Sequence, residues 1–221
     1  MGQYYKFMIG DPNDYQIPKG IDSWKYDNGA KLMEHSYVGN GFVDAAIRLL
    51  EQWSSIDKPA RVVWMGDYGD SDLPDIVSQN KNECDKCIFL YHAYCNAWRY
   101  SGEDSAPAMD LEELPLRDYE LRHHSRSGVI IDLDRKEYVR IIEKPEEKDE
   151  NGWWVLQIHP LPLLTSVGCG NGGGDYYGAC MDWVGAWAGD HIVWMEDEDF
   201  EDLAIRHELK ELDIEFKEER R

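Results

Sequence analysis

A glycine-rich stretch in the second half of the chain constrains the fold more than any other segment. From Gly168 to Gly178 the chain places six glycines in eleven positions. Glycine inside a helix or a strand costs free energy, and it is kept where φ is positive or where another group approaches the backbone closely. The stretch is therefore predicted to be a loop. A shorter version of it, Gly39-Asn40-Gly41, occurs in the first half.

Two interpretations of the glycine-rich stretch stay open. Successive backbone N–H groups in such a loop can hold an anion. Alternatively, the stretch is a tight loop packed beneath Tyr176 and Tyr177, which is the interpretation we favour. It does not match a Walker loop, since no Gly-Lys-Ser/Thr follows and no basic residue lies within it. It does not match a dinucleotide-binding fingerprint either, because no helical pattern begins there.

Hydrophobic periodicity predicts an α+β fold, built mostly of antiparallel hairpins and strands with a few helices. Strands are predicted at Gln3–Ile9, Tyr15–Ile17, Ala60–Met65, Gly128–Ile131, Tyr138–Ile142, Trp153–Ile158, His191–Met195 and, near the end, Leu212–Phe216. Helices are predicted at Val43–Trp53 and Cys84–Arg99, with a short one after Glu196. His159–Leu164 is predicted to be extended, since proline biases the preceding residue away from helix.

The two halves of the chain share an order of parts, which predicts an internal duplication with pseudo-twofold symmetry. A hairpin comes first in each half, then a Gly-Asn-Gly, then a Val-Trp-Met strand. Asn40 precedes Trp64 by 24 positions, and Asn171 precedes Trp194 by 23. The predicted organisation is a first half at 1–100, an acidic loop or linker at 101–127 and a second half at 128–221, forming one unit.

Polar side chains beside the glycines and at strand ends are the candidate ligand-binding set. Carboxylates and an imidazole in such places can bind a divalent cation or act as acid and base. Carboxylates in Gly-Asp turns more often cap the turn itself, which is the competing interpretation. The candidate residues are Glu34, His35, Asn40, Asp67, Tyr68, Asp70, Asn171, Gly173, Gly174, Asp175, Tyr176 and Asp190.

A second candidate site is a metal centre formed by Cys84, Cys87, His92 and Cys95. Zinc prefers thiolate and imidazole ligands, and a Cys-x-x-Cys pair holds two of them. A helix through these residues would place them on partly different faces, so we favour free thiols. The five cysteines of the chain are expected to be reduced rather than paired.

The charge of the chain limits its partners. Formal net charge is −21, from 44 acidic and 23 basic residues. Such a surface repels phosphate backbones, so direct nucleic-acid binding is not expected. It would suit a basic protein partner or a surface that imitates nucleic acid, although charge that only keeps the protein in solution is the interpretation we rank first. The start of the chain shows no secretory signal, and no apolar run approaches transmembrane length. A cytoplasmic protein without a membrane partner is therefore expected.

Four short segments of the sequence resemble segments of known proteins. They are Met-Gly-Gln-Tyr-Tyr-Lys at the start, Lys-Leu-Met-Glu-His-Ser to position 36, Ile-His-Pro-Leu-Pro-Leu-Leu to position 164 and Gly-Asn-Gly-Gly-Gly-Asp-Tyr to position 176. Together they resemble a family of uncharacterised bacterial and phage proteins, over nearly the whole chain. The resemblance implies a prokaryotic or viral setting, with host cytoplasm as the location for a phage protein. It implies no activity, and it does not include the Cys84-x-x-Cys87 pair.

Two function hypotheses follow from these observations. The first is an acidic binding protein that acts on a protein partner as an inhibitor, an immunity-like protein or an accessory protein. The second is a small-ligand or nucleotide-binding protein, or a hydrolase, that uses the glycine-rich loop with Asp67 and Asp175.

Overall fold

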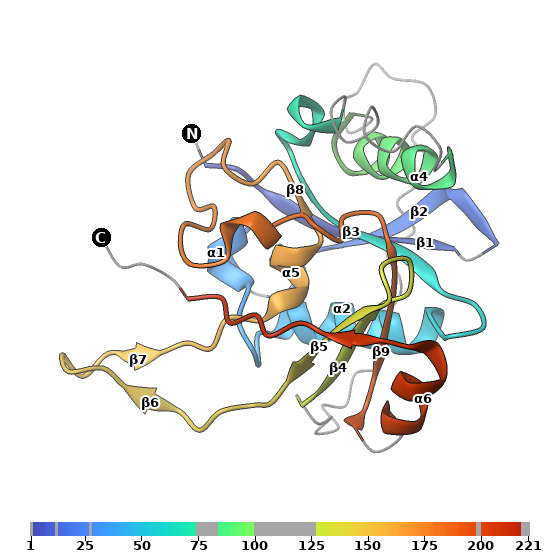
Figure 1. Cartoon of the computed structure of the whole chain (residues 1–221). Coiled ribbons are helices and arrows are strands. Elements are labelled where there is room, and N and C mark those ends of the chain that lie inside the picture. Colours follow the sequence, from blue (N-terminus) through green and yellow to red (C-terminus); the bar gives the residue numbers. More distant parts are fainter. Residues whose placement is uncertain are drawn as a thin grey trace.

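One mixed but mainly antiparallel sheet forms the centre of the protein (Figure 1). The structure, a computed structural model, describes residues 2–11, 13–26, 28–73, 84–99, 127–197 and 200–217. The predicted linker at 101–127 therefore lies outside the described residues, apart from its last position. The described residues form an α+β fold, as predicted.

Most of the predicted strands are present, and two further short strands, at Glu147–Lys148 and Ser166–Val167, lie where none was predicted. The strands are β1 (Tyr5–Asp11), β2 (Asp14–Asp22), β3 (Ala60–Gly66), β4 (Gly128–Asp132), β5 (Glu137–Ile141), β6 (Glu147–Lys148), β7 (Trp154–Val155), β8 (Ser166–Val167), β9 (His191–Met195) and β10 (Lys210–Glu211). The main sheet has the order β10-β5-β4-β9-β3-β1-β2, with β8 paired to β3. The last strand lies just before the predicted Leu212–Phe216, and β7 is shorter than the predicted Trp153–Ile158.

The helices lie on both faces of this sheet. They are α1 (Leu32–His35), α2 (Gly41–Trp53), α4 (Cys84–Tyr94), α5 (Pro160–Leu164) and α6 (Phe200–His207), with short turns η1 (Ser23–Tyr26), η2 (Gly69–Ser71), η3 (Cys95–Arg99) and η4 (Met181–Trp183). The predicted helices at Val43–Trp53, at Cys84–Arg99 and in the tail are confirmed, with η3 continuing α4 as a π-helical turn.

The prediction that His159–Leu164 is extended is wrong, because Pro160–Leu164 forms α5. The first N–H groups of a helix have no intrahelical partner, so prolines at the first turn lose no hydrogen bond there. The Nδ1 of His159 accepts a hydrogen bond from the backbone N–H of Leu161 at 3.2 Å and so caps the helix start. The histidine, which precedes the first proline, keeps the extended backbone that proline favours.

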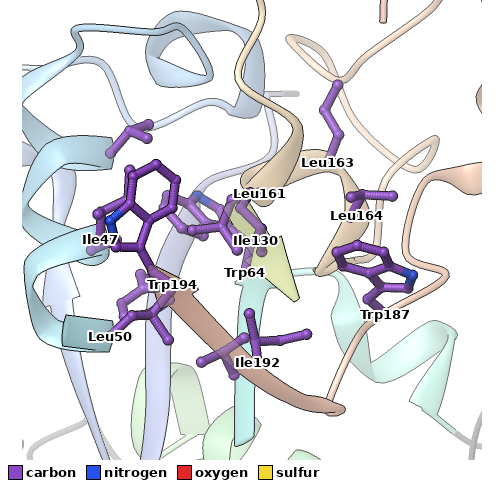
Figure 2. Close-up of a cluster of buried hydrophobic side chains, with 14 of the residues drawn as sticks. Ile47, Leu50, Trp64, Ile130, Leu161, Leu163, Leu164, Trp187, Ile192 and Trp194 are labelled. Atoms are coloured by element: carbon purple, nitrogen blue, oxygen red, sulfur yellow. The ribbon is translucent and has the colours of Figure 1, made fainter. Parts of the chain in front are cut away.

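Alternation along the strands divides the core between the two faces. Val62 and Trp64 of β3 point to the face that α2 and α5 cover, and Figure 2 shows the side chains of that cluster. Val63 and Met65 point to the opposite face, against α4. On that same opposite face, α6 covers β4, β5 and β9 through Phe200.

The two halves of the sheet have matching topologies. In the first half of the sheet, β3 pairs with β1 of the β1–β2 hairpin, and in the second half β9 pairs with β4 of the β4–β5 hairpin. The two halves meet where β3 and β9 pair in antiparallel orientation. Phe7 lies opposite Trp64 in one half, and Ile130 lies opposite Trp194 in the other. The helix after the third strand, α4 or α6, covers the same face. Duplication of the sequence stays a prediction.

Residues 142–157, which we call the arm, leave the body of the molecule after β5. The arm carries β6 and β7 as a short antiparallel hairpin, with Lys148 opposite Trp154. Figure 1 shows it extending away from the sheet and its covering helices. Nothing in the hydrophobic periodicity of the sequence distinguishes this hairpin from those inside the sheet.

Candidate functional site

The glycine-rich loop starts where β8 lies beside the end of β3. Ser166 and Val167 pair with Trp64 and Met65, and the chain then turns at Gly168, whose φ is +97°. This places the loop next to the turn that follows Gly66 and next to the segment that leads into β1. The glycine-rich loop and the Gly-Asp turn are thus brought together from opposite halves of the chain.

Asp175 organises the glycine-rich loop from within. Its Oδ2 accepts hydrogen bonds from the backbone N–H groups of Gly170 at 2.8 Å and Gly172 at 2.9 Å. Its Oδ1 accepts a hydrogen bond from the hydroxyl of Tyr5 at 3.0 Å, and the side chain is buried. The anion held by these N–H groups is therefore a carboxylate of the loop itself. This arrangement counts against the nucleotide hypothesis, because a phosphate would have to displace Asp175.

The neighbouring residues of the loop tie it to other segments. The carbonyl of Gly173 accepts a hydrogen bond from the N–H of Gln3 at 3.2 Å, and that of Gly174 accepts one from Met33 at 3.0 Å. Tyr176 is fully buried, and its hydroxyl contacts the carbonyl of Lys217 at 2.8 Å. These contacts describe a packed loop, as favoured from the sequence, but it packs beneath Tyr176 only, because Tyr177 is exposed.

The Gly-Asp turn, at Gly66–Asp72, contacts the glycine-rich loop through Asn171. The Nδ2 of this exposed side chain donates hydrogen bonds to the Oγ of Ser71 at 3.2 Å and to the Oδ1 of Asp72 at 3.1 Å. Asp67 accepts a hydrogen bond from the backbone N–H of Tyr4 at 3.0 Å. Tyr68 is half-buried, and its carbonyl accepts a hydrogen bond from the hydroxyl of Ser71 at 2.7 Å. Burial raises the pKa of Tyr5 most, and the neighbouring Cys169, Asp175 and Asp67 raise it further.

Three further candidates make contacts that shape the fold. The Glu34 carboxylate accepts a hydrogen bond from the N–H of Lys31 at 3.1 Å, at the start of α1. Asn40 caps α2, because its Oδ1 accepts a hydrogen bond from the N–H of Phe42 at 2.9 Å. The Nε2 of buried His35 accepts a hydrogen bond from the indole N–H of Trp64 at 2.8 Å, so its Nδ1 carries the proton that reaches Gly29. A ligand-binding role for these residues stays a prediction.

Burial keeps His35 neutral. It lowers the pKa of the imidazole to about 4, although the hydrogen bond to Gly29 and the charge of Glu34 act in the opposite direction. The imidazole is therefore uncharged at neutral pH and has both nitrogens engaged. In this state it serves as a polar link between α1 and the sheet rather than as an acid or a base.

A surface pocket of about 350 Å³ lies against the loop. Its lining includes Asp72, Ser166, Gly168, Cys169, Met181 and Val184. Burial, together with the charges of Asp175 and Asp72, raises the pKa of the Cys169 thiol to about 11. Because the thiolate is the nucleophilic form of cysteine, Cys169 does not have the properties of a catalytic nucleophile at neutral pH.

The predicted metal centre on α4 stays untested. The side chain of Cys84 lies outside the described part, while Cys95 is buried and Cys87 and His92 are half-buried. Within the described ranges, no three His, Cys, Asp or Glu side chains are grouped closely enough to hold a metal ion. Among the described residues, Cys87, Cys95, Cys169 and Cys180 form no disulfide bond.

A buried charge network joins the two halves, and the sequence indicated only Asp190 among its members. Asp190 contacts Lys86 of α4 and accepts a hydrogen bond from the Nε of Arg135 at 3.1 Å. Burial and the neighbouring Asp190 raise the pKa of the Asp132 carboxyl group well above its ordinary value. No local signal in the sequence shows that Lys86 reaches Asp190.

Comparison of the chain with protein-family models, curated proteins and solved structures finds no match. Among the helices of the described residues, none combines the length and the apolar character needed to cross a lipid bilayer. The arguments about function therefore rest on this chain's own side chains.

Proposed function

We propose that this protein acts by binding a basic protein partner, as an inhibitor, an immunity-like protein or an accessory protein of the cytoplasm. The arm supplies the main contact. The single observation that carries the proposal is the run of four large apolar side chains that the arm leaves in water. Their exposed fractions are 68% for Trp153, 54% for Trp154, 50% for Val155 and 58% for Leu156.

The geometry of a strand explains why this run is unusual. Successive side chains of a strand point to opposite faces, so a strand packed on a protein body buries every second one. In the arm all four consecutive side chains are exposed, so this segment presents apolar side chains on both of its faces. Contiguous exposed apolar surface of this kind marks interaction sites, and Trp is enriched among the residues that dominate binding energy.

Charge on the arm indicates the kind of partner. Glu143, Glu146, Glu147 and Glu150 are exposed around the apolar run. The whole chain has a formal net charge of −21, so its field attracts basic surfaces and accelerates their association. The same field repels nucleic acid. A basic protein with an apolar groove therefore fits the arm better than other partners do.

Hydrogen bonds at both ends of the arm hold it in a defined shape. At the tip, the Oδ1 of Asp149 accepts hydrogen bonds from the N–H groups of Asn151 and Trp153, each at 2.9 Å. At the root, Gln157 donates to the carbonyl of Ile142 at 2.9 Å and accepts from the N–H of Lys144 at 2.9 Å. A preorganised hairpin loses less conformational entropy on binding than a disordered segment does.

The test uses a double variant of the arm, Trp153→Ser with Trp154→Ser, and a matched control. Trp24→Ser is the control, because Trp24 is also 68% exposed but lies in η1, outside the arm. Each protein is immobilised, incubated with a bacterial lysate and washed at rising salt. The captured partner is then purified and titrated against all three proteins.

We expect the native chain and Trp24→Ser to capture the same basic protein and to release it as salt rises. We expect the arm variant to bind the purified partner at least about tenfold more weakly, as loss of an interface anchor does. Equal affinity of the arm variant would contradict the proposal. So would a concentration-dependent dimer that the arm variant abolishes, because the arm would then bind a second copy of the chain.

A further inference from the structure

We propose that the chain joins itself by a covalent amide bond between the side chains of Lys86 and Asp190, with Asp132 and Arg135 as the catalytic groups. The reaction is an intramolecular condensation that releases one water molecule and takes place once in each chain. The ammonium group of Lys86 contacts the Oδ1 of Asp190 in the interior of the protein. The inference goes beyond the proposed function, since none of these residues belongs to the arm.

Burial distinguishes the contact between Lys86 and Asp190 from an ion pair at the surface. The exposed fractions are 5% for Lys86, 1% for Asp190 and 0% for Asp132. Removing two charges from water is costly, and the attraction between them offsets that cost only in part. An amide is neutral, so its formation removes both buried charges. The exclusion of water also disfavours hydrolysis of the product.

The packing of α4 positions Lys86 for this reaction. Leu90 of α4 lies against Gly189, whose φ is +79°, and a Cβ on this glycine would be only 2.9 Å from the Cγ of Leu90. Lys86 is one helical turn before Leu90 on the same face of α4, so the contact directs it toward Asp190. The carbonyl of Asp190 accepts a hydrogen bond from the N–H of Val62 at 3.2 Å, which holds its backbone on β3. Oriented groups of this kind react with effective concentrations of about 10⁵–10⁸ M.

Asp132 supplies the acid–base group. Its carboxyl group lies beside that of Asp190, close enough for a hydrogen bond between the two. Two carboxyl groups form such a bond only when one of them carries a proton. The buried Oδ2 of Asp132 receives no hydrogen bond from any residue that the structure describes, so a proton placed there satisfies it. Its Oδ1 accepts a hydrogen bond from the backbone N–H of Arg135 at 2.9 Å.

The guanidinium group of Arg135 holds the two carboxyl groups together. Its Nε lies 3.1 Å from the Oδ2 of Asp190 and 3.7 Å from the Oδ2 of Asp132. A fixed positive charge beside an oxygen that becomes negative during a reaction stabilises the transition state. Lys86 contacts one oxygen of Asp190 and Arg135 contacts the other, so the nucleophile and the stabilising charge do not compete for the same atom.

The condensation balances without any further reactant. Lys86 gives one proton to the Oδ1 of Asp190, and its nitrogen then bonds to Cγ while an electron pair of the carboxyl group moves onto Oδ2, beside Arg135. Asp132 gives its proton to Oδ1 and takes one from the nitrogen. The Cγ–Oδ1 bond breaks, Oδ1 leaves with two protons as water, and the electron pair on Oδ2 re-forms the C=O bond of the amide. Asp132 ends with a proton, as it began.

The main measurement is the mass of the denatured native chain, followed by protease digestion and sequencing of the peptides by mass spectrometry. We expect a chain that is lighter than its sequence by one water molecule. Digestion should yield one branched peptide in which Lys86 is joined to Asp190. In Lys86→Arg the positive charge remains, but the guanidinium group is not a nucleophile, so this variant should have its full sequence mass and no branched peptide.

A pair of variants tests the role of Asp132. Each protein is made by cell-free synthesis, quenched in denaturant at intervals and analysed for the branched peptide. Asp132→Asn should slow its formation about 100-fold or more, as loss of an acid–base group does. Asp134→Asn is the matched control, because Asp134 lies in the same turn but pairs with His191 at 2.8 Å, and it should form the link at the native rate. Circular dichroism shows whether each variant is folded.

The link should also stabilise the fold, because it joins positions that are 104 residues apart. Closing a loop of this length removes conformational entropy from the unfolded chain, so Lys86→Arg should lower the midpoint of thermal unfolding by on the order of 10 °C. A native chain with its full sequence mass would overturn the proposal, and so would a loss of water that persists in Lys86→Arg. Equal rates for Asp132→Asn and Asp134→Asn would overturn the assignment of Asp132.

Discussion

The two Gly-Asn-Gly segments have the same sequence but form different structures. Gly39-Asn40-Gly41 starts α2, because the Asn40 side chain caps the helix and apolar residues at helical spacing follow it. Gly170-Asn171-Gly172 stays a loop, because Asp175 accepts hydrogen bonds from its N–H groups. The tripeptide is therefore a turn that can lead to either structure, and the residues after it decide which one forms.

The largest effect is expected when the carboxylate that holds the second Gly-Asn-Gly segment is removed. Asp175→Ala leaves the N–H groups of Gly170 and Gly172 and the hydroxyl of Tyr5 without their acceptor. We expect the free energy of unfolding to fall by about 3 kcal/mol, since the buried Tyr5 hydroxyl left unsatisfied costs roughly 1–3 kcal/mol and each lost hydrogen bond of the two part-buried N–H groups roughly 0.5–1.5 kcal/mol. Urea unfolding measures this loss.

Asp175→Asn is the control for that variant, because its amide oxygen can still accept from both N–H groups. It should lose less than half as much stability. Added formate should partly restore Asp175→Ala, since a small carboxylate can occupy the vacated position. A native urea midpoint for Asp175→Ala would show that the loop does not depend on its carboxylate.

The second test lowers the pH, because protonation of His35, which lies just before the first Gly-Asn-Gly segment, should destabilise the fold. His35 has a pKa of about 4 in the folded protein, below its ordinary value of 6.5. Between these values the unfolded chain takes up a proton that the folded chain does not. The contribution of His35 to stability is therefore complete above pH 6.5 and declines as pH falls toward 4, by on the order of 3 kcal/mol in total.

The measurement compares the native chain with His35→Gln at several pH values by urea unfolding. Glutamine can accept from Trp64 and donate to Gly29, but it does not titrate. The variant should be less stable at pH 7.5, and the difference should shrink as pH falls from 6.5 to 4. A constant difference over this range would exclude the neutral buried imidazole as a source of acid sensitivity.

The smallest effects are expected for the two asparagines themselves. Asn40→Ala removes a helix cap and should cost about 1 kcal/mol of unfolding free energy. Asn171→Ala removes an exposed side chain and should cost less than about 0.5 kcal/mol. Asn40→Ser, which retains a capping oxygen, is the control. Equal losses at the two positions would contradict the distinction between a helix start and a carboxylate-held loop.

The sequence predicted secondary structure correctly where the signal is a pattern of neighbouring residues. Short apolar runs predicted β1, β3, β4 and β9, and helical spacing predicted α2, because both patterns depend on neighbouring residues alone. The extended prediction for His159–Leu164 was wrong because proline disfavours helix in general but not in a first turn. Local rules could not show that His159 would cap that turn.

The candidate site was only partly predictable. The glycine-rich loop and the turn at Asp67 do lie together, in contact through Asn171 and Asp72. The burial of Gln3 beside the loop was not predicted, because a glutamine in a strand-like segment gives no sign that three glycines from distant segments will enclose it. Asp72 was missed as well, because an aspartate in an acidic turn does not differ from its neighbours by sequence.

By itself, the sequence determined the α+β class, the hairpins, the main helices and the demand for a loop at Gly168–Gly178. Only the tertiary structure decided that Asp175 would hold that loop, that Lys86 would reach Asp190, and that the arm would stand clear of the body. The physical reason is the range of the interactions. Backbone preferences and periodicity act over a few residues, whereas hydrogen bonds and burial at these sites join residues far apart in the chain.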